Sequence, residues 1–185
     1  MPPLEPVAPS PTGVDPAAFR TAVGAFATGV CVVTTRVGGL DHAMTANSFA
    51  SVSLDPAMVL FCVSRQSRFH RAVLDTGEWV VNILAEPAEP AARWLATPGR
   101  PLLGQLDQVP HLAGADTGLP VLVQALAALE CRTAAVHPAG DHSIVLGEVT
   151  GVLLGGEDLS PLLYHRRQYR VLPRAVNVAS VTSQS

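Results

Sequence analysis

Short runs of apolar residues, broken by turn signals, predict a mostly β protein. The runs are rich in Val, Thr, Ile and Phe, and Gly-Gly, Asp-Pro or Ser-containing segments separate them, which is typical of strands joined by hairpins. The run at 57–64 is apolar throughout, and it predicts a strand buried on both faces. In chain order, strands are expected at 30–35, 43–53, 57–64, 78–84, 122–136, 143–154 and 161–165.

Helical spacing marks a first helix near the beginning of the chain. Asp15 and Pro16 form an N-cap and first-turn pair. Large apolar residues then recur at helical intervals, and Gly29 closes the segment. These residues are Phe19, Val23 and Phe26. An amphipathic helix is therefore predicted over 16–27.

Two more helices are predicted between the strands. Ser67 can cap a helix over about 68–76, which Gly77 stops. Residues 86–97 predict a third helix, whose regular part is confined to its later half by two prolines. Residues 98–120 are rich in Gly and Pro without a clean period, and a long surface loop is expected there.

These elements together predict a single mainly β domain. Sequential strands joined by short turns imply antiparallel pairing, and a closed or nearly closed barrel would hide the sheet edges. Two or three short helices are inserted between the strands. The domain is expected over 15–172, between a flexible Pro-rich arm at 1–14 and a flexible polar tail at 173–185.

Composition limits the classes of partner that this domain is expected to bind. Of 185 residues, 48% are hydrophobic and only 15% are charged, and the mean hydropathy is +0.31. Surplus apolar surface of this kind favours a homo-oligomer. Twelve basic and fifteen acidic residues give a net charge of −3, which argues against nucleic-acid binding. Every basic residue is arginine, so lysine chemistry is excluded.

Cysteine usage and the N-terminus point to the cytoplasm. The three cysteines are far apart and lack CxxC spacing, so neither a disulfide framework nor a zinc site is expected, nor any other metal. The N-terminus lacks the basic and apolar regions of a signal peptide. The apolar runs stop short of the roughly 18 residues of a membrane span, so no membrane association is expected.

Three segments carry candidate chemistry, and each also has an ordinary structural interpretation. The strand over 42–53 interleaves small and hydroxyl residues, which suits a flat ligand or simply a solvent-facing strand. The segment 64–70 places Ser and Arg side chains at a helix N-terminus, which suits a phosphate or is an ordinary capped helix. The turn at 137–142 presents Asp141 and His142, which can bind a ligand or stay idle in solvent.

The order of these motifs resembles one family. The strings MTANSF, SLDP, GDH and PLLYH-x-x-x-Y follow one another at family-like spacing between Phe19 and Tyr169. In this respect the chain is similar to the flavin reductase family, the small NAD(P)H:flavin oxidoreductase components of two-component monooxygenases. The resemblance implies an antiparallel split β-barrel of the FMN-binding, Greek-key type, which dimerises and binds flavin near the dimer interface.

The resemblance also implies site residues. The isoalloxazine ring would lie beside the segment from His42 to Ser48, at the positions Met44, Thr45, Ala46, Asn47 and Ser48. The ribityl-phosphate end would be held by Cys62, Val63, Ser64, Ser67 and Arg68. Asp141 and His142 match the GDH motif near the nicotinamide cofactor, and Tyr169 would close the pocket.

Two positions depart from the family pattern. Ala43 stands where glycine is common, so its methyl group could narrow the pocket. Phe69 replaces a frequent small hydroxyl residue, which could remove a phosphate ligand. Both departures leave the choice between FMN and FAD open.

The hypothesis for the reaction is hydride transfer from NADH (or NADPH) to FMN or FAD, and a partner monooxygenase then receives the reduced flavin. The cofactors carry this chemistry, and backbone N–H groups of 45–48 would stabilise charge on the reduced ring. His142 would position the nicotinamide. No arginine cluster selects a 2′-phosphate, which favours NADH.

Two alternatives remain open at the level of sequence. In the first, the barrel retains its flavin and acts directly on an organic substrate; Ala43, Phe69 and the loop at 98–120 would suit such a modified pocket. In the second, the chain is a non-catalytic flavin-binding or haem-type module. Oxidation of NADH with and without added flavin distinguishes these alternatives from a reductase.

Overall fold

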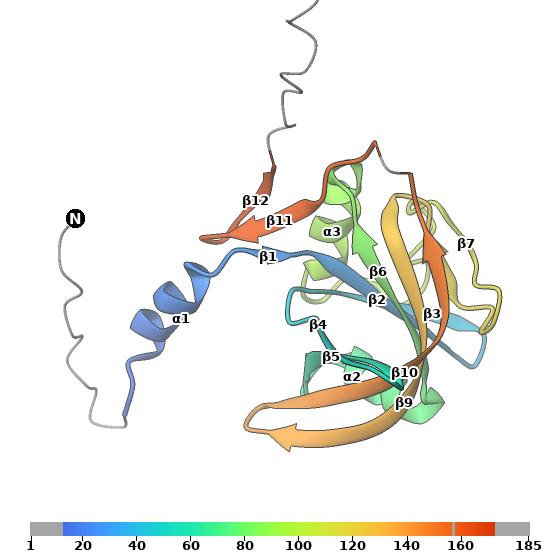
Figure 1. The fold of residues 1–185 in the computed structure, drawn as a ribbon. Coiled ribbons are helices and arrows are strands. Elements are labelled where there is room, and N and C mark those ends of the chain that lie inside the picture. The colour runs from blue at the N-terminus through green and yellow to red at the C-terminus, as the bar shows by residue number, and fades with distance from the viewer. Residues whose placement is uncertain (1–12, 157, 173–185) are drawn as a thin grey trace, which may run out of the picture.

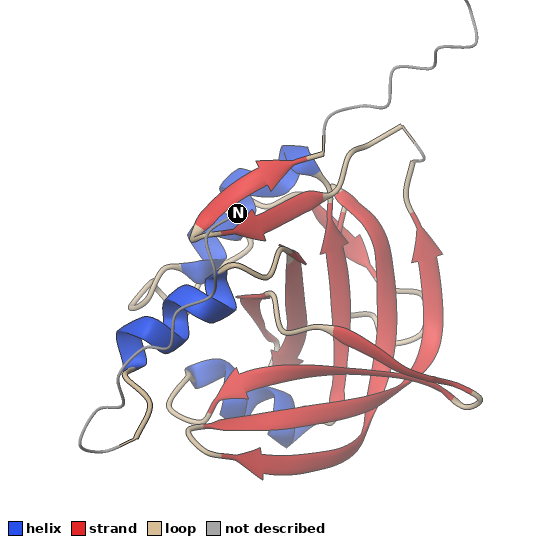
Figure 2. Ribbon diagram, turned by 60° about the vertical axis from the view of Figure 1, so that its left-hand side comes forward, coloured by secondary structure: helices blue, strands red, loops and turns tan. Residues whose placement is uncertain are grey.

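The computed structural model describes residues 13–156 and 158–172, which form a mainly β structure with a few short helices (Figure 1). The strands curl into an open barrel, and helix α1 stands apart on one side (Figures 1 and 2). The predicted arm at 1–14 lies outside the described residues apart from Gly13 and Val14, and the predicted tail at 173–185 lies wholly outside them.

A seven-stranded sheet, in the order β3-β2-β6-β9-β10-β5-β4, forms the barrel wall. All its neighbouring strands pair antiparallel, which confirms the predicted fold class. The sheet does not close, because β3 and β4 remain its two edges. Its strands are β2 (Cys31–Val37), β3 (Leu40–Ala46), β4 (Ala50–Leu54), β5 (Ala57–Ser64), β6 (Glu78–Leu84), β9 (Ala125–Ala139) and β10 (His142–Leu154).

The smaller strands form two separate sheets. β1 (Thr28–Gly29) and β12 (Gln168–Val171) both pair with β11 (Leu162–His165). The predicted strand near 161–165 corresponds to β11, whereas β12 was not predicted as a strand. The strand predicted to begin at 122 instead begins at Ala125, because β8 (Pro120–Leu122) pairs separately with β7 (His111–Ala113).

The core consists mainly of two large clusters, and β2 contributes to both of them. Val33 belongs to the cluster that contains Phe61 and Trp79, whereas Val32 belongs to the cluster that contains Leu84. Successive side chains of a strand point to opposite faces, so β2 is buried on both sides. The prediction of such burial for 57–64 was wrong. In β5, buried residues alternate with partly exposed ones, since only one of its faces meets the core.

The strand predicted over 43–53 is two strands at opposite edges of the sheet. β3 ends at Ala46 and β4 begins at Ala50, so residues 47–49 cross the split between the edges. The Ser48 hydroxyl lies 3.0 Å from the Cys62 nitrogen and 3.2 Å from the Cys62 oxygen, which attaches this crossing to β5. The local residue pattern does not predict such a bend, because the bend depends on contacts with β5.

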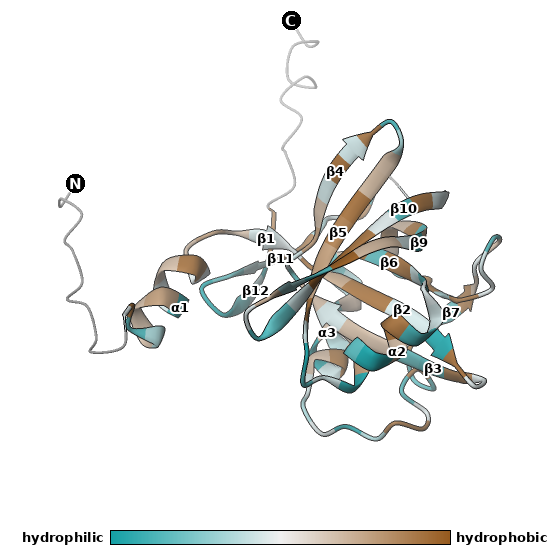
Figure 3. Ribbon diagram, turned by 90° about the horizontal axis from the view of Figure 1, so that it is seen from below, coloured by the Kyte–Doolittle hydropathy of each residue, from teal (hydrophilic) through white to brown (hydrophobic). Residues whose placement is uncertain are grey.

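The helices begin where the sequence predicted. α1 (Pro16–Gly24) is capped by Asp15, and α2 (Arg68–Thr76) is capped by Ser67 and ends at Gly77, which has φ of 67°. The third predicted helix is a 3-10 turn (Glu86–Ala88) followed by α3 (Glu89–Ala96). No residue of α1 is buried, and Figure 3 shows the helix standing apart from the sheet.

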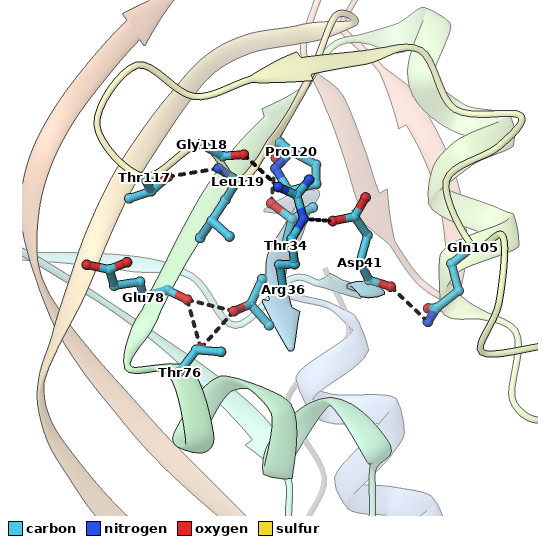
Figure 4. A network of polar contacts seen from close by, with 11 residues as sticks. Thr34, Arg36, Asp41, Thr76, Glu78, Gln105, Thr117, Gly118, Leu119 and Pro120 are labelled. Carbon is cyan, nitrogen blue, oxygen red and sulfur yellow. Dashed lines mark hydrogen bonds and ion pairs between the residues drawn. The ribbon is translucent and has the colours of Figure 1, made fainter. Parts of the chain in front are cut away.

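The segment 98–120 is anchored to the barrel rather than lying freely on the surface. Gln105, Leu106 and Val109 are buried. Arg36 forms an ion pair with Asp41 at 2.6 Å and donates to the Gly118 carbonyl at 3.1 Å (Figure 4). Most residues of the segment are exposed, as expected of a surface loop, but it contains the short strand β7, and long-range side-chain contacts hold it.

Candidate functional site

A cavity of about 450 Å³ lies where edge strand β3 meets the N-terminus of α2 and the segment after α3. β3 contributes His42, Ala43, Met44 and Thr45, the start of α2 contributes Gln66, Ser67, Arg68 and Phe69, and the remaining lining comes from Leu95 to Gln105. We call this space the cationic cavity. It unites the first two candidate segments of the sequence.

Positive charge dominates the cationic cavity. Arg68, Arg100 and His42 line it, and no carboxylate side chain is among its described lining residues. Burial and the nearby Arg68 charge lower the pKa of Arg100. Burial and Arg68 also lower the pKa of His42, although Asp41 acts in the opposite direction. Mutual repulsion of this kind is relieved when an anion binds between the cations.

The hydrogen-bond donors of this cavity fit a phosphate. Ser67 caps α2 by accepting from the His70 nitrogen at 3.1 Å, and the free N–H groups of a helix N-terminus favour anions. The Arg100 Nε is buried and has no hydrogen-bond partner among the described residues. Such an orphaned donor costs free energy unless a ligand satisfies it, so the residues present fit the phosphate end of a flavin.

A second space, of about 800 Å³, separates α1 from the barrel. Its walls are largely apolar, and we call it the apolar cleft. Thr28 Oγ1, in its lining, is buried without a partner in the described part of the chain. The cleft is lined by Phe19, Arg20, Val23, Gly24, Phe26, Ala27, Thr28 and Gly29 of the α1 region together with Cys31, Asn47, Ser48, Phe49, Ile83, Tyr164 and Arg167.

The predicted flavin segment borders both spaces. Met44 and Thr45 line the cationic cavity, whereas Asn47 and Ser48 line the apolar cleft. Ala46, between them, points into the core. The Thr45 hydroxyl donates to the Ala92 carbonyl at 2.8 Å and so fastens this segment to α3. One continuous stretch of backbone therefore leads from the cations to the apolar walls.

The three β5 residues of the predicted phosphate end lie outside both linings. Cys62 holds Ser48 through its backbone, and Val63 is 1% exposed in the core. Ser64 ends β5 and is the register partner of His142. Of the predicted phosphate ligands, Ser67 and Arg68 are the two that line the cationic cavity.

Asp141 and His142 form a pair at the tip of the β9–β10 hairpin. Their side chains approach to 2.7 Å through His142 Nδ1. The hydrogen bond and charge of His142 lower the pKa of Asp141. The Asp141 carbonyl accepts from the Arg65 nitrogen at 3.0 Å, which attaches the hairpin tip to the turn before α2. The pair is outside both linings but next to the turn that contributes to the cationic cavity.

Tyr169 lies at the other end of the barrel. Its ring packs edge-on against Tyr164, with centroids 5.4 Å apart, and the Arg93 guanidinium lies 4.7 Å from its centroid. Burial raises the pKa of Tyr169, and Arg93 opposes this effect. Tyr164, rather than Tyr169, lines the apolar cleft.

Sequence reasoning missed Arg100. It follows Pro98 and Gly99 in a segment without periodicity, so no local pattern marked it. The two departures from the family pattern both line the cationic cavity, and each also packs into the core. Ala43 is 1% exposed and belongs to a core cluster, and Phe69 packs edge-on against Phe61 at 6.4 Å.

The chain belongs to the flavin reductase family, because the model of the flavin reductase like domain matches residues 23–173. This confirms the resemblance drawn from the motifs. An NADH-dependent FAD reductase of Streptomyces globisporus is 41% identical over 148 residues, covering 77% of this chain and 80% of that protein. The reductase subunit HsaB of a flavin-dependent monooxygenase from Rhodococcus jostii is 34% identical over 84% of this chain and 77% of its own.

Solved structures show the same fold. The NADH:FAD oxidoreductase of Streptomyces globisporus, in complex with NAD and FAD fragments, superposes with a TM-score of 0.84 at 32% identity. The match covers 93% of this chain and all of that one. The flavin reductase component of a bacterial two-component tryptophan halogenase gives a TM-score of 0.81 at 39% identity, over 86% of this chain and 99% of its own.

The described residues contain neither a metal-binding cluster nor a membrane-spanning helix. No group of three or more His, Cys, Asp or Glu side chains is placed to hold a metal ion within 13–156 and 158–172. No helix in the same ranges is long and apolar enough to cross a membrane.

Proposed function

We propose that this chain is an NADH-dependent flavin reductase that supplies reduced FAD or FMN to a partner monooxygenase. The observation that carries the proposal is the continuous segment 44–48, which borders both the cationic cavity and the apolar cleft. A flavin has an anionic phosphate at one end and a flat ring at the other, so it matches this pair of spaces. Membership of an oxidoreductase family supports the same conclusion.

The residues of the cationic cavity would bind the phosphate of the flavin. Ser67, Arg68 and the N-terminus of α2 supply charge-assisted hydrogen bonds. Met44 and Thr45 would contact the ribityl chain, and Asn47 and Ser48 would orient the ring. The nicotinamide supplies a hydride and the flavin accepts it, while the protein contributes orientation and electrostatics.

Residues near this path have supporting roles in the proposal. His142 would position the nicotinamide cofactor, with Asp141 holding its Nδ1 at 2.7 Å. Cys62, Val63 and Ser64 would support the site through the β5 backbone, since Cys62 already holds Ser48 in this way. Tyr169 would close the pocket indirectly, because it packs on the Tyr164 ring that lines the apolar cleft.

The proposed assembly is a homodimer in the cytoplasm. The apolar residues of α1 and of the turn after it have no cover in one chain: Phe19 is 59%, Val23 54% and Phe26 73% exposed. A second copy seated on this face would bury it and close the apolar cleft. A reducing compartment agrees with Cys31, Cys62 and Cys131, which are all free.

The experiment is NADH oxidation by the purified chain with and without added FAD or FMN. We expect turnover that depends on free flavin and is faster with NADH than with NADPH. Turnover at the same rate without added flavin would instead indicate an enzyme that retains its flavin. Flavin binding without NADH oxidation would indicate a binding module.

A further inference from the structure

The cationic cavity extends beyond the part that the proposed phosphate ligands occupy. Ser67 and Arg68 come from the start of α2, whereas Thr97, Arg100 and Leu102 form a second wall that comes from the segment after α3. Its volume of about 450 Å³ is many times the roughly 30 Å³ that one water occupies. Pockets of 300–1,000 Å³ are the usual size for an organic ligand. In the proposed function the phosphate and the ribityl chain use the walls formed by α2 and β3, so the wall from the segment after α3 has no assigned ligand.

The second wall carries its own cation. Arg100 Nη1 donates to the Thr97 carbonyl at 3.1 Å, and Nη2 donates to the Ala43 carbonyl. These bonds hold the guanidinium against the outer edge of β3. Arg68 in turn donates to the Arg100 carbonyl at 2.5 Å. The two guanidinium groups therefore belong to different elements and are fixed by different partners.

Arg100 has binding capacity that its structural contacts leave unused. Its Nε is buried with no partner among the described residues, and no carboxylate lines the cavity to balance its charge. Near Arg100 the wall is apolar, formed by Leu95, Pro98 and Leu102. A second anionic group attached to a flat apolar ring would satisfy both features.

We propose that Arg100 binds the second phosphate of FAD, with the adenosine against the apolar wall, so that this chain prefers FAD to FMN. The proposal rests on the proposed function. It makes Arg100 a residue that determines flavin specificity. A rival role is that Arg100 binds the phosphate that FMN and FAD share. In that role it would substitute for the small hydroxyl residue that Phe69 replaces.

The test is the affinity of the full chain for FAD and for FMN, measured by quenching of flavin fluorescence. Arg100→Gln keeps a side-chain donor for the Ala43 carbonyl but removes the charge. We expect wild type to bind FAD more tightly, and the ratio of the FMN Kd to the FAD Kd to fall about tenfold in the variant. Arg71→Ala is the matched control, because Arg71 is 88% exposed on α2 and lies outside the cavity lining; its ratio should equal that of wild type.

Other results overturn the proposal. Equal losses of affinity for both flavins in Arg100→Gln would assign Arg100 to the shared phosphate, and an unchanged ratio would assign it a structural role. A wild type that prefers FMN would also overturn it. If Arg100→Gln does not fold, Arg100→Lys should give a smaller drop in the ratio of the FMN Kd to the FAD Kd, because lysine keeps the charge but lacks the planar set of N–H donors of the guanidinium. An unchanged ratio in Arg100→Lys would also overturn the proposal. Absence of any flavin binding by wild type would instead contradict the proposed function.

Discussion

The pair of Asp141 and His142 has a fixed orientation although it lies near solvent. The His142 side chain is 45% exposed, and its Nδ1 is engaged by Asp141 at 2.7 Å. This contact fixes the ring, leaving Nε2 as the nitrogen that can face a ligand. The hairpin tip is itself held by the Arg65 nitrogen, so a positioning role needs no large rearrangement.

Replacement of His142 by Ala should affect the nicotinamide cofactor far more than the flavin. We expect the KM for NADH to rise about tenfold, with a much smaller change in the flavin Kd, because an orienting contact is worth about 1.4 kcal/mol. Steady-state kinetics and flavin titration measure the two quantities. His137→Ala, on the exposed part of the same hairpin, is the control. An equal rise in the KM for NADH and in the flavin Kd would contradict this role.

Glu130 is a buried acid whose ionised form is stabilised by the fold. It is 1% exposed and accepts from the Thr117 nitrogen at 2.7 Å, the Thr117 hydroxyl at 2.6 Å and the Asp116 nitrogen at 3.2 Å. Burial acts to raise its pKa, but these hydrogen bonds outweigh burial and lower the pKa below its ordinary value of 4.5. Glu130 thereby holds the end of the segment 98–120 against β9.

This lowered pKa predicts a pH dependence of stability. The stabilisation by Glu130 is complete above the unfolded-state pKa and is lost as the pH falls through the lower folded-state pKa. Glu130→Gln should reduce the free energy of unfolding at neutral pH by about 2 kcal/mol. As the pH falls below the ordinary pKa of 4.5, the gap between wild type and variant should shrink. Urea unfolding at several pH values measures it, and a constant gap would contradict the assignment.

At the scale of elements, a glycine sets how closely β10 approaches the core. A Cβ at Gly147 would lie 2.3 Å from Cζ2 of Trp79. The Trp79 ring is fully buried, packs edge-on against Phe61 at 4.9 Å and donates from Nε1 to the Thr133 hydroxyl at 3.0 Å. These contacts leave the ring no room to move away.

Gly147→Ala should therefore destabilise the barrel by about 1–3 kcal/mol, the usual cost of overpacking. Thermal or urea unfolding followed by tryptophan fluorescence measures the change and reports on the Trp79 environment. Gly156→Ala provides the comparison, because an added Cβ there meets nothing within 4 Å. If both variants unfold together with wild type, the close approach of Gly147 to Trp79 has no energetic weight.

Elements with strong local signals were predictable from sequence, and elements fixed by distant partners were not. The Ser67 cap and Gly77 stop located α2, and the turn at Gly140 located the long hairpin. The break at 47–49 escaped prediction because Ser48 bonds to Cys62, far along the chain. Burial of β5 on one face only depends equally on which strands and core residues surround it.

The same distinction applies to the candidate site. The family motifs identified Met44, Thr45, Ser67 and Arg68, which the fold gathers in one cavity. Arg100 could not be found in this way, because its importance comes from the β3 edge that it contacts. An edge strand leaves backbone carbonyls unpaired, and the residue that reaches them is set by the path of a loop rather than by a motif.

At the scale of the whole molecule, α1 is the least supported element. It has nine residues and buries none of them, and an isolated helix of this length is marginal in water. The β11–β12 hairpin does touch its end, where the Arg166 nitrogen donates to the Gly24 carbonyl at 2.8 Å. Its apolar side nevertheless faces the open cleft, and the second copy in the proposed dimer would stabilise it.

Phe26→Glu should weaken the proposed dimer, because Phe26 is 73% exposed in one chain and a charge there would oppose burial against a second copy. We expect light scattering to give a dimeric mass for wild type and a lower mass for the variant at the same concentration. Thr21→Glu, on the opposite side of α1, should stay dimeric. Because Asn47 and Ser48 line the same cleft, loss of the dimer should also weaken flavin binding. A monomeric wild type that still binds flavin tightly would show that one chain holds a complete site.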